Sequence, residues 1–386
     1  MSRATPALTG HDAGGSPKRR AAGIGAAVRV LVAAVAACFL PLAIGGRPHV
    51  AVAGMNVWTS NGPTDGTMPV EGRALAVDPT TPGTVYAGTS GAGIFKSIDG
   101  GSTWNLTTTG EQLEYVVTLA TDPTGTVYAA AGRVFKSSDG GSNWTDTGSP
   151  GTTLYGLAVE PSAPGMVYGC ANYYARENAL ISVIRSPDGG ASWQPAATGL
   201  SPATCAALAV DPRTPCRGSG LRRTCGTVYS GLNGMGVGRS INHGRHWRHS
   251  LEGVVYALAV DPTSPGGVYA GTFGGGVYKS TDGGGSWSAA DAGLVNGDPS
   301  NRAGLVFAVA ADPVTPGTVY AGTNGAGVFK STDGGMSWSA FNAGLSSGQV
   351  NNLGIDSAYD VYSLAIDPTT ATLYAATDAG VFDVVQ

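Results

Sequence analysis

The sequence predicts an all-β fold, a single seven-bladed β-propeller of four-stranded blades over residues 54–386. Two observations predict it. The composition favours turns over helices, and one short apolar phrase ending in a tight turn occurs seven times, at intervals of 38 to 55 residues. A four-stranded sheet at a period of roughly 40–50 residues is the repeating unit of a propeller.

The composition excludes several other classes of protein. The 386 residues include 61 glycines and 23 prolines, and only 12% are charged, about half the usual share of roughly 25%. Such a chain lacks the Glu-, Lys- and Ala-Leu-rich runs that helices need. Helical bundles, coiled coils and charged disordered tails are therefore excluded, while 42% apolar residues suffice for a large core.

Residues 1–53 have the pattern of a targeting segment. Basic residues at Lys18-Arg19-Arg20 precede an apolar run from Val30 to Ile44, and small residues follow at Ala51-Val52-Ala53. This order is typical of a secretory signal peptide, and the run is short for a membrane span of about 20 residues. We expect export with cleavage near residue 53. Two alternatives stay open: an uncleaved membrane anchor, and a lipoprotein-like box at Cys38.

The charge balance of residues 54–386 limits the partners. Without the targeting segment the chain holds 16 basic and 25 acidic residues, a net charge of −9. An acidic, exported protein is a poor match for nucleic acid. We expect a monomer that binds a protein or a polysaccharide and touches a membrane only through its N-terminal segment. No cofactor or metal is expected.

The first repeated phrase defines the inner half of each blade. In its first copy, Leu75-Ala76-Val77-Asp78-Pro79 leads through a turn to Val85-Tyr86-Ala87-Gly88-Thr89. The pattern predicts an inner strand over 75–77 and further strands over 84–87, 93–97 and 102–106. The other six copies are marked by Asp122, Asp211, Asp261, Asp312 and Asp367, and by the variant Glu160-Pro161.

A second phrase, Ser-x-Asp-Gly-Gly-x-x-Trp, follows most copies. Its acids are Asp99, Asp139, Asp188, Asp282 and Asp333; its tryptophans are Trp104, Trp144, Trp193, Trp287 and Trp338, with Trp247 ending a degraded copy. The phrase is that of the Asp-box, or BNR, repeat, so residues 55–386 resemble the Asp-box propeller proteins. The carboxylate can accept backbone N–H bonds across its turn, and the indole can pack between blades. Five identical contexts indicate turn structure rather than catalysis.

The count of phrases predicts how the ring closes. Seven first phrases stand beside six boxes, and the last unit ends at Gly380-Val381-Phe382-Asp383 without a box. The segment Asn56-Val57-Trp58-Thr59 matches Ser286-Trp287-Ser288 and its counterparts. We therefore expect Trp58 to belong to the missing fourth strand of the seventh blade. Closure of this kind removes the exposed edge of an open sheet.

Four cysteines remain after the targeting segment, an even number that in an exported protein indicates disulfides. Cys216 and Cys225 flank a short insertion and are expected to pair. By elimination, Cys170 and Cys205 form the second pair.

Irregular loops on the face opposite the boxes are the first candidate binding sites, because loops on a rigid scaffold commonly carry function. Long inter-blade loops run over 294–304 and 344–359, and an insertion at 172–178 interrupts the third unit. Within it, Tyr173, Tyr174, Arg176 and Glu177 offer aromatic faces and charges for a sugar or peptide. An ordinary solvated loop is the alternative.

Two glycosidase classes have similar repeats. Sialidases use an Arg-Ile-Pro motif that is absent here, and their ring has six blades. Xyloglucanase-type hydrolases resemble the repeats more closely and carry an acid after the Val-Tyr-Ala-x-Thr strand, a pattern that Thr377-Asp378-Ala379-Gly380 matches loosely. Those enzymes place the second carboxylate on a second propeller. Asp378 is thus a weak catalytic candidate that lacks an evident partner for two-carboxylate chemistry.

The fourth unit is unusually basic. Seven arginines fall within 36 residues that hold no acid: Arg213, Arg217, Arg222, Arg223, Arg239, Arg245 and Arg248. His243, His246 and His249 lie among them, but residues three apart in a strand do not share a face, so a metal site is not expected. A basic patch on an acidic protein can attract an anionic partner; a drifted repeat with solvated arginines is the alternative.

The leading hypothesis is an exported, non-catalytic propeller that binds a protein or glycan on its loop face. Photosystem II assembly factors, which are single seven-bladed propellers with similar repeats, imply that such a scaffold can bind a partner without catalysis. The alternative is a glycoside hydrolase of the xyloglucanase or sialidase type that acts on an extracellular polysaccharide.

Overall fold

The computed structural model describes residues 56–64, 69–107, 113–148, 152–163, 165–174, 180–213, 226–294, 304–350 and 356–386. All belong to one compact unit, Ala51–Gln386. The expected targeting segment lies outside the described residues. Within the described ranges the chain forms strands and turns, with no helix of the length and apolarity that a membrane crossing requires. The predicted all-β class is confirmed.

Seven antiparallel four-stranded sheets form the blades, and the blades follow one another in the order of the chain. Blades 1 and 2 contain β2 (Gly72–Val77), β3 (Val85–Thr89), β4 (Ile94–Ser97), β5 (Asn105–Leu106), β6 (Thr118–Thr121), β7 (Val127–Ala131), β8 (Arg133–Ser137) and β9 (Thr145–Asp146). Blades 3 and 4 contain β10 (Leu154–Val159), β11 (Val167–Tyr174), β12 (Leu180–Ser186), β13 (Gln194–Pro195), β14 (Cys205–Asp211), β15 (Thr227–Leu232), β16 (Gly236–Ser240) and β17 (Arg248–Leu251).

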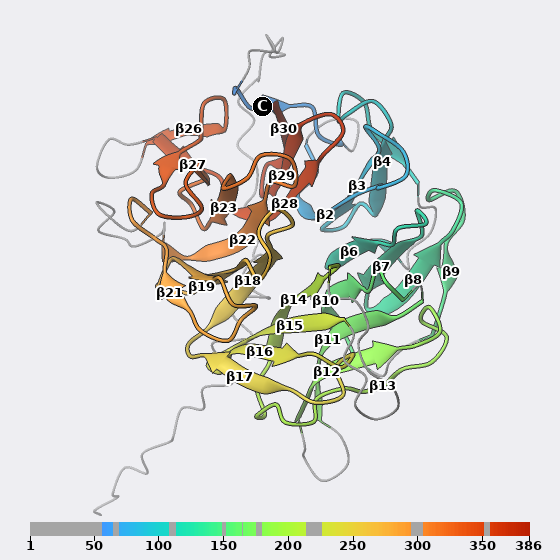
Figure 1. Ribbon diagram of the computed structural model, residues 1–386. Coiled ribbons are helices and arrows are strands. Elements are labelled where there is room, and N and C mark those ends of the chain that lie inside the picture. Colours follow the sequence, from blue (N-terminus) through green and yellow to red (C-terminus); the bar gives the residue numbers. More distant parts are fainter. Residues whose placement is uncertain are drawn as a thin grey trace, which may run out of the picture. The chain divides into compact units, whose positions relative to one another are not determined.

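Blades 5 and 6 contain β18 (Val255–Val260), β19 (Val268–Thr272), β20 (Val277–Ser280), β21 (Ser288–Ala289), β22 (Val306–Ala311), β23 (Val319–Thr323), β24 (Val328–Ser331) and β25 (Ser339–Ala340). Blade 7 contains β28 (Val361–Asp367), β29 (Thr372–Thr377), β30 (Gly380–Val385) and β1 (Thr59–Ser60). The inner strands β2, β6, β10, β14, β18, β22 and β28 contact one another in that order, and β28 contacts β2 again. The sheets therefore form a closed ring, a seven-bladed β-propeller (Figure 1).

The N-terminal strand closes the ring, as predicted. Thr59 and Ser60 of β1 pair antiparallel with Asp383 and Phe382 of β30. The Trp58 side chain is buried, and its indole N–H donates to the carbonyl of Phe341 in blade 6 at 2.6 Å. Gly344 has a left-handed φ of 85°, and a Cβ there would meet the Trp58 carbonyl oxygen at 2.2 Å. Glycine at this position lets the two chain segments come together.

The boxes form hydrogen-bonded turns at one end of the blades. In the first box the Asp99 carboxylate accepts from the amide of Thr103 at 2.8 Å and from the Ser97 hydroxyl at 2.7 Å. The Ser97 hydroxyl oxygen in turn accepts the Gly101 amide. The Gly100 amide donates to the carbonyl of Gly83, so box turns and Asp-Pro turns lie on one face, the box face. The turns after the second strands and the inter-blade connections lie on the opposite face, the loop face.

Neighbouring blades are joined at equivalent positions. A fully buried tyrosine occupies the second or third position of each second strand: Tyr86, Tyr128, Tyr168, Tyr229, Tyr269, Tyr320 and Tyr374. Next to it in the third strand stands a basic residue in blades 1 to 6. Lys96 and Lys279 each donate to a glycine carbonyl in the box of the following blade, both at 2.8 Å. These bonds tie blade 1 to blade 2 and blade 5 to blade 6.

Two local expectations differ from the structure. The fourth strand was expected over 102–106 in the first unit but covers only Asn105–Leu106, because residues 98–104 form the box turn. The expected loop over 344–359 contains an antiparallel hairpin of β26 (Ser346–Val350) and β27 (Asp356–Ala358).

Candidate functional site on the loop face

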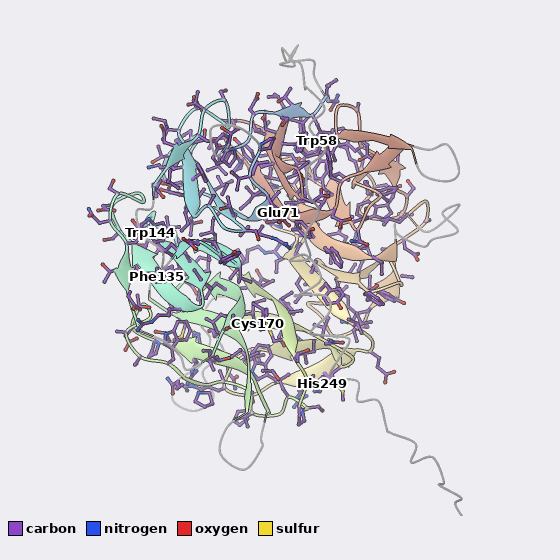
Figure 2. The ribbon with its side chains drawn as sticks, turned by 180° about the vertical axis from the view of Figure 1, so that it is seen from behind. Trp58, Glu71, Phe135, Trp144, Cys170 and His249 are labelled. Carbon is purple, nitrogen blue, oxygen red and sulfur yellow. A yellow bond between two sulfur atoms is a disulfide. The ribbon has the colours of Figure 1, made fainter. Side chains whose placement is uncertain are left out.

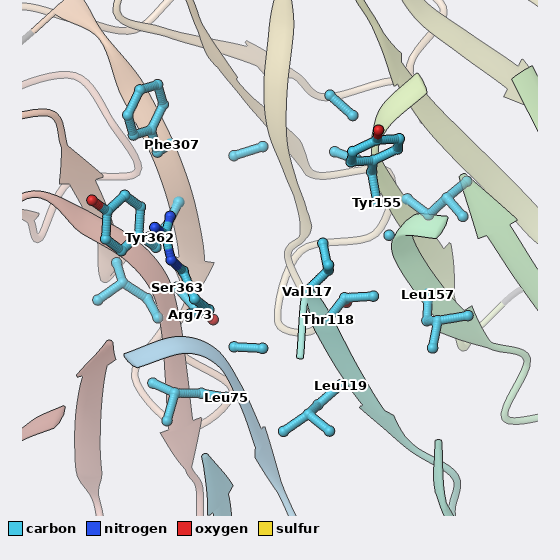
Figure 3. A pocket seen from close by; sticks show the side chains of 18 of the residues that line it. Arg73, Leu75, Val117, Thr118, Leu119, Tyr155, Leu157, Phe307, Tyr362 and Ser363 are labelled. Atoms are coloured by element: carbon cyan, nitrogen blue, oxygen red, sulfur yellow. The ribbon is translucent and has the colours of Figure 1, made fainter. Parts of the chain in front are cut away.

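A cavity of about 210 Å³ lies at the centre of the ring, lined by the inner strands of all seven blades. Each inner strand ends at an Asp-Pro turn on the box face, so its first residues lie at the loop-face end of this central cavity, which we call the channel. Figure 3 shows the side chains of Arg73, Phe307 and Tyr362 on one side of the cavity and Tyr155 across from them.

The second residue of the inner strand differs from blade to blade, although the rest of the strand is nearly constant. From blade 1 to blade 7 this position holds Arg73, the residue Val117 that precedes β6, Tyr155, Ala206, Tyr256, Phe307 and Tyr362. Four of the seven are aromatic. Tyr256 packs edge-on against Phe307, with ring centroids 5.6 Å apart, and against the half-exposed Phe273. The loop-face end of the channel is therefore rich in partly exposed aromatic rings.

Carboxyl groups gather at the same end, between blades 7 and 1. Glu71 precedes β2 and lies toward the middle of the ring of blades (Figure 2). Its carboxylate forms an ion pair with Arg73 at 2.6 Å, and the Arg73 guanidinium stacks on the Tyr362 ring, 4.3 Å from the centroid. Asp360 precedes β28, and Asp378 occupies the turn between β29 and β30, where its amide donates to the Asp360 carbonyl at 3.4 Å.

The electrostatics of this acid cluster bring the pKa of one carboxyl group up toward neutral pH. Desolvation, together with the negative charges of Asp360 and Glu71, raises the pKa of Asp378 to about 6. Desolvation also raises the pKa of Glu71, against the opposing charge of Arg73. Carboxyl groups that share a site push each other's pKa upward in this way. Asp378 is exposed at the surface, so a ligand can reach it.

Asp378 is thus not the isolated acid that the sequence indicated. Glu71 and Asp360 precede the inner strands of adjacent blades, and only ring closure brings them beside the turn that holds Asp378. Both neighbouring acids come from within the same propeller, so the second carboxylate need not come from another domain. Sequence comparison with two-propeller enzymes could not reveal this.

The insertion in the third unit extends a hairpin. Tyr173 and Tyr174 belong to β11 and pair with Ile181 and Leu180 of β12, beyond an irregularity after Cys170. Arg176 and Glu177 lie outside the described residues. Tyr173 and Tyr174 therefore stand at the loop-face end of blade 3 and are not part of the channel lining.

The arginines of blade 4 divide into separate groups. Arg213 pairs with Asp211 at 3.1 Å, while Arg239 and Arg248 lie in β16 and β17. Arg245 is exposed in the degraded box turn. The remaining three, Arg217, Arg222 and Arg223, lie outside the described residues.

The three histidines of blade 4 have different partners. His243 contacts Glu160 through Nδ1 at 2.8 Å, and the His249 ring lies between the Ser201 amide and the Met235 carbonyl. His246 is exposed, and its amide donates to the Asn242 side chain. In the described part of the chain, no three His, Cys, Asp or Glu groups converge on a position for a metal ion.

A disulfide joins Cys170 of β11 to Cys205 of β14, with Cα atoms 5.1 Å apart. It links blade 3 to blade 4 from within the protein, since both residues are buried. Cys216 and Cys225 lie outside the described residues.

The box acids are held by their own turns: hydrogen bonds from Asn143 and Ser137 lower the pKa of Asp139 to about 2.

Comparison with known proteins supports the fold. No protein-family profile matches the chain. The chain is 35% identical over 80 residues to a xyloglucanase of Hypocrea jecorina, a stretch that covers 20% of this chain and 9% of that protein. The GH74 xyloglucanase structure from Xanthomonas campestris superposes with a TM-score of 0.63 at 20% identity, over 84% of this chain and 53% of that one.

A second structure has nearly the same extent as this chain. YCF48 from Cyanidioschyzon merolae superposes with a TM-score of 0.59 at 13% identity, over 86% of this chain and 98% of that one. The resemblance to xyloglucanase-type propellers is confirmed for the fold. The chain spans about half the length of the xyloglucanase structure, so activity does not follow from the likeness.

Proposed function

We propose that the chain is an exported, non-catalytic propeller that binds a glycan at the loop-face end of its central channel. The observation that carries the proposal is the combination of partly exposed aromatic rings with carboxyl groups around one opening. Aromatic faces stack on the apolar faces of sugar rings, and carboxylates accept hydrogen bonds from sugar hydroxyls. The regional identity to a xyloglucanase favours a β-linked plant-type polysaccharide as the first ligand to test.

Binding should be measured on the full chain with xyloglucan, its oligosaccharides and a panel of other polysaccharides, by calorimetry and affinity electrophoresis. Replacement of Tyr155 or Tyr362 by Ala is expected to weaken binding by about tenfold or more, since a stacked ring contributes about 0.5–1.5 kcal/mol beyond its buried area. Met336→Ala is a matched control, because Met336 is 75% exposed in a box turn on the other face. Equal losses in the control and the ring variants would contradict the proposal, as would the absence of glycan binding.

A second candidate function is glycoside hydrolysis with Asp378 as the general acid. The raised pKa of Asp378 and the two acids beside it favour this candidate, because hydrolysis needs one protonated and one ionised carboxyl group. The same polysaccharide panel should be assayed for new reducing ends with wild-type protein and with Asp378→Asn. Cleavage that disappears in this variant would replace the binding role with the enzymatic one. Binding without cleavage retains the binding role.

A further inference from the structure

A row of side chains on blade 4 differs from the equivalent row in every other blade. In the β-ladder, Tyr229 of β15 pairs with Arg239 of β16, which pairs with Arg248 of β17. Directly paired residues of antiparallel strands project from the same face of the sheet. Arg239 and Arg248 are therefore cross-strand neighbours on one face of β16 and β17, the two outer strands of blade 4 (Figure 1).

The other blades avoid two like charges at this place. The residue opposite the third-strand cation is Asn105 in blade 1, Thr145 in blade 2, Gln194 in blade 3, Ser288 in blade 5 and Ser339 in blade 6. Like charges directly opposite each other destabilise a sheet. Blade 4 alone of these six carries a cation on both strands, an arrangement that a bound anion would stabilise.

The described residues supply no negatively charged partner for the pair. Neither Arg239 nor Arg248 forms an ion pair with an acid in the described part of the chain. In blade 5 the glycine carbonyl of the next box accepts from both Tyr269 and Lys279, whereas in blade 4 the Tyr229 hydroxyl donates to it at 3.0 Å. The Arg239 Nε is buried without a hydrogen-bond acceptor. Arg248 is exposed, so the pair can be reached from solvent.

A third arginine lies near the same tyrosine. Arg213 takes the place that threonine holds in the Asp-Pro turns of blades 1, 2, 5 and 7, and its Nε donates to Asp211. Both of its terminal nitrogens are buried, and no acceptor for them lies among the described residues. Desolvation raises the pKa of Tyr229 to about 12; the charges of Arg239 and Arg213 oppose that rise and the charge of Asp211 adds to it, so all three charged groups lie close to the tyrosine.

We propose that Arg239 and Arg248 form a binding site for a tetrahedral oxyanion, a phosphate or sulfate group, on the outer strands of blade 4, beside the Arg213–Asp211 ion pair. Two guanidinium groups side by side present forked donors that match such an anion. The site is separate from the channel mouth on the loop face, and it does not depend on the proposed glycan binding.

The test titrates wild-type protein with inorganic phosphate and inorganic sulfate by calorimetry at constant ionic strength, with sodium chloride as the reference salt. Dextran sulfate and neutral dextran form a second arm that distinguishes a free ion from an ester on a polymer. The key variants are Arg239→Lys and Arg248→Ser, alone and together. They restore the pairing of blades 5 and 6, so the fold should tolerate them, and thermal unfolding checks this directly.

Each single variant is expected to lose about ten- to a hundredfold in affinity, because a hydrogen bond to a charged group contributes about 1.5–3 kcal/mol. Arg133→Ser removes one positive charge at an ion pair elsewhere and should leave binding unchanged. The reverse change in blade 5, Lys279→Arg with Ser288→Arg, is expected to create a second site. Binding of dextran sulfate alone, lost in the variants, would identify a polymer-borne ester as the ligand.

Three results would overturn the proposal: a wild-type protein that binds none of the three anionic probes, phosphate or sulfate effects that equal those of chloride, or anion binding that the folded double variant retains.

Discussion

Thr59 and Asp383 lie opposite each other in the last blade although 324 residues separate them, and the Thr59 hydroxyl donates to the Asp383 carboxylate at 3.1 Å. The same carboxylate accepts from the Asn61 side chain at 3.2 Å. In blades 1 to 6 the position of Asp383 holds a cation. Blade 7 instead uses an acid at this position, and that acid holds the closing strand.

Removing the Trp58 side chain should open this closure. Trp58 contacts Phe341 edge-on at 5.9 Å and is almost fully buried, so Trp58→Ala is expected to lower the free energy of unfolding by about 3–5 kcal/mol. Chemical denaturation monitored by circular dichroism measures the change. Trp104→Ala is the matched control: the Trp104 indole bonds only within its own box turn and is half-buried, so a smaller loss is expected. Equal losses in the two variants would show that Trp58 in the closing segment stabilises the protein no more than a box tryptophan does.

The boxes should make the protein sensitive to strong acid. Hydrogen bonds from Asn143 and Ser337 hold the pKa values of Asp139 and Asp333 at about 2, against an ordinary 3.8. Groups with lowered pKa values stabilise the fold above the unfolded-state pKa, and this stabilisation is lost as the pH falls through the folded-state pKa. The melting temperature is therefore expected to fall between about pH 4 and pH 2.

The matched variants for this acid effect are Asp139→Asn and Asp333→Asn. Asn242 already occupies the equivalent place in blade 4, where its side-chain oxygen accepts the His246 amide at 2.9 Å, so the fold tolerates the amide. The double variant should show a shallower dependence of melting temperature on pH over this window. An unchanged slope would assign acid sensitivity to other groups.

The disulfide should stabilise the seam between blades 3 and 4. Its cysteines are 35 residues apart in sequence, and replacing both Cys170 and Cys205 by Ala is expected to cost about 2–4 kcal/mol. Melting temperatures with and without reductant measure the effect. The double alanine variant is its own control, because reductant should no longer shift its melting temperature. A shift of wild-type size in that variant would trace the effect to other cysteines.

Glu160 and His243 should be energetically coupled. Glu160 replaces the usual Asp, is fully buried, and accepts from the Tyr168 hydroxyl at 2.7 Å and from the His243 ring at 2.8 Å. His243 replaces the first box glycine and keeps its left-handed backbone, with φ at 57°. The longer Glu160 side chain and the His243 ring, both absent from the regular repeats, therefore bind each other.

Glu160→Asp and His243→Gly alone should each destabilise the protein by about 1–3 kcal/mol, because a buried charged group loses a partner. The double variant restores the Asp and the Gly that the regular repeats carry at these positions. Its loss of stability should therefore be smaller than the sum of the two single losses by about 1 kcal/mol or more. Denaturation of all four proteins completes the cycle. Strictly additive losses would show that the two departures are independent.

The repeats were sufficient to predict the ring, because each Asp-Pro turn and each box is a local structure that its own residues specify. Closure through Trp58 was also predictable, since one fourth strand was missing and one tryptophan lay outside the boxes. The candidate site was predictable only in part. An alignment of the seven inner strands does reveal a variable position, which holds Tyr155 and Tyr362. The box phrases, which are the more conspicuous repeats, do not contain this position.

The acid cluster could not be read from the sequence. Glu71 and Asp378 are 307 positions apart, and nothing local marks either as more than a surface turn acid. Their proximity follows from closure of the whole ring. The sequence showed that blade 4 is rich in arginine, but it did not show which arginines are paired across the strands. Only the ladder shows that Arg239 and Arg248, rather than the other arginines of blade 4, lie directly opposite each other.

The closing strand has a mechanical consequence. The Asn56 amide donates to the Val385 carbonyl, so the start of β1 lies beside the end of β30, and only two residue pairs follow before the strand ends. Tension applied between these two ends would therefore load the ladder in an unzipping direction, one bond after another. In a single-molecule pulling experiment blade 7 would part first and at low force, while the six remaining blades stayed folded as an open ring.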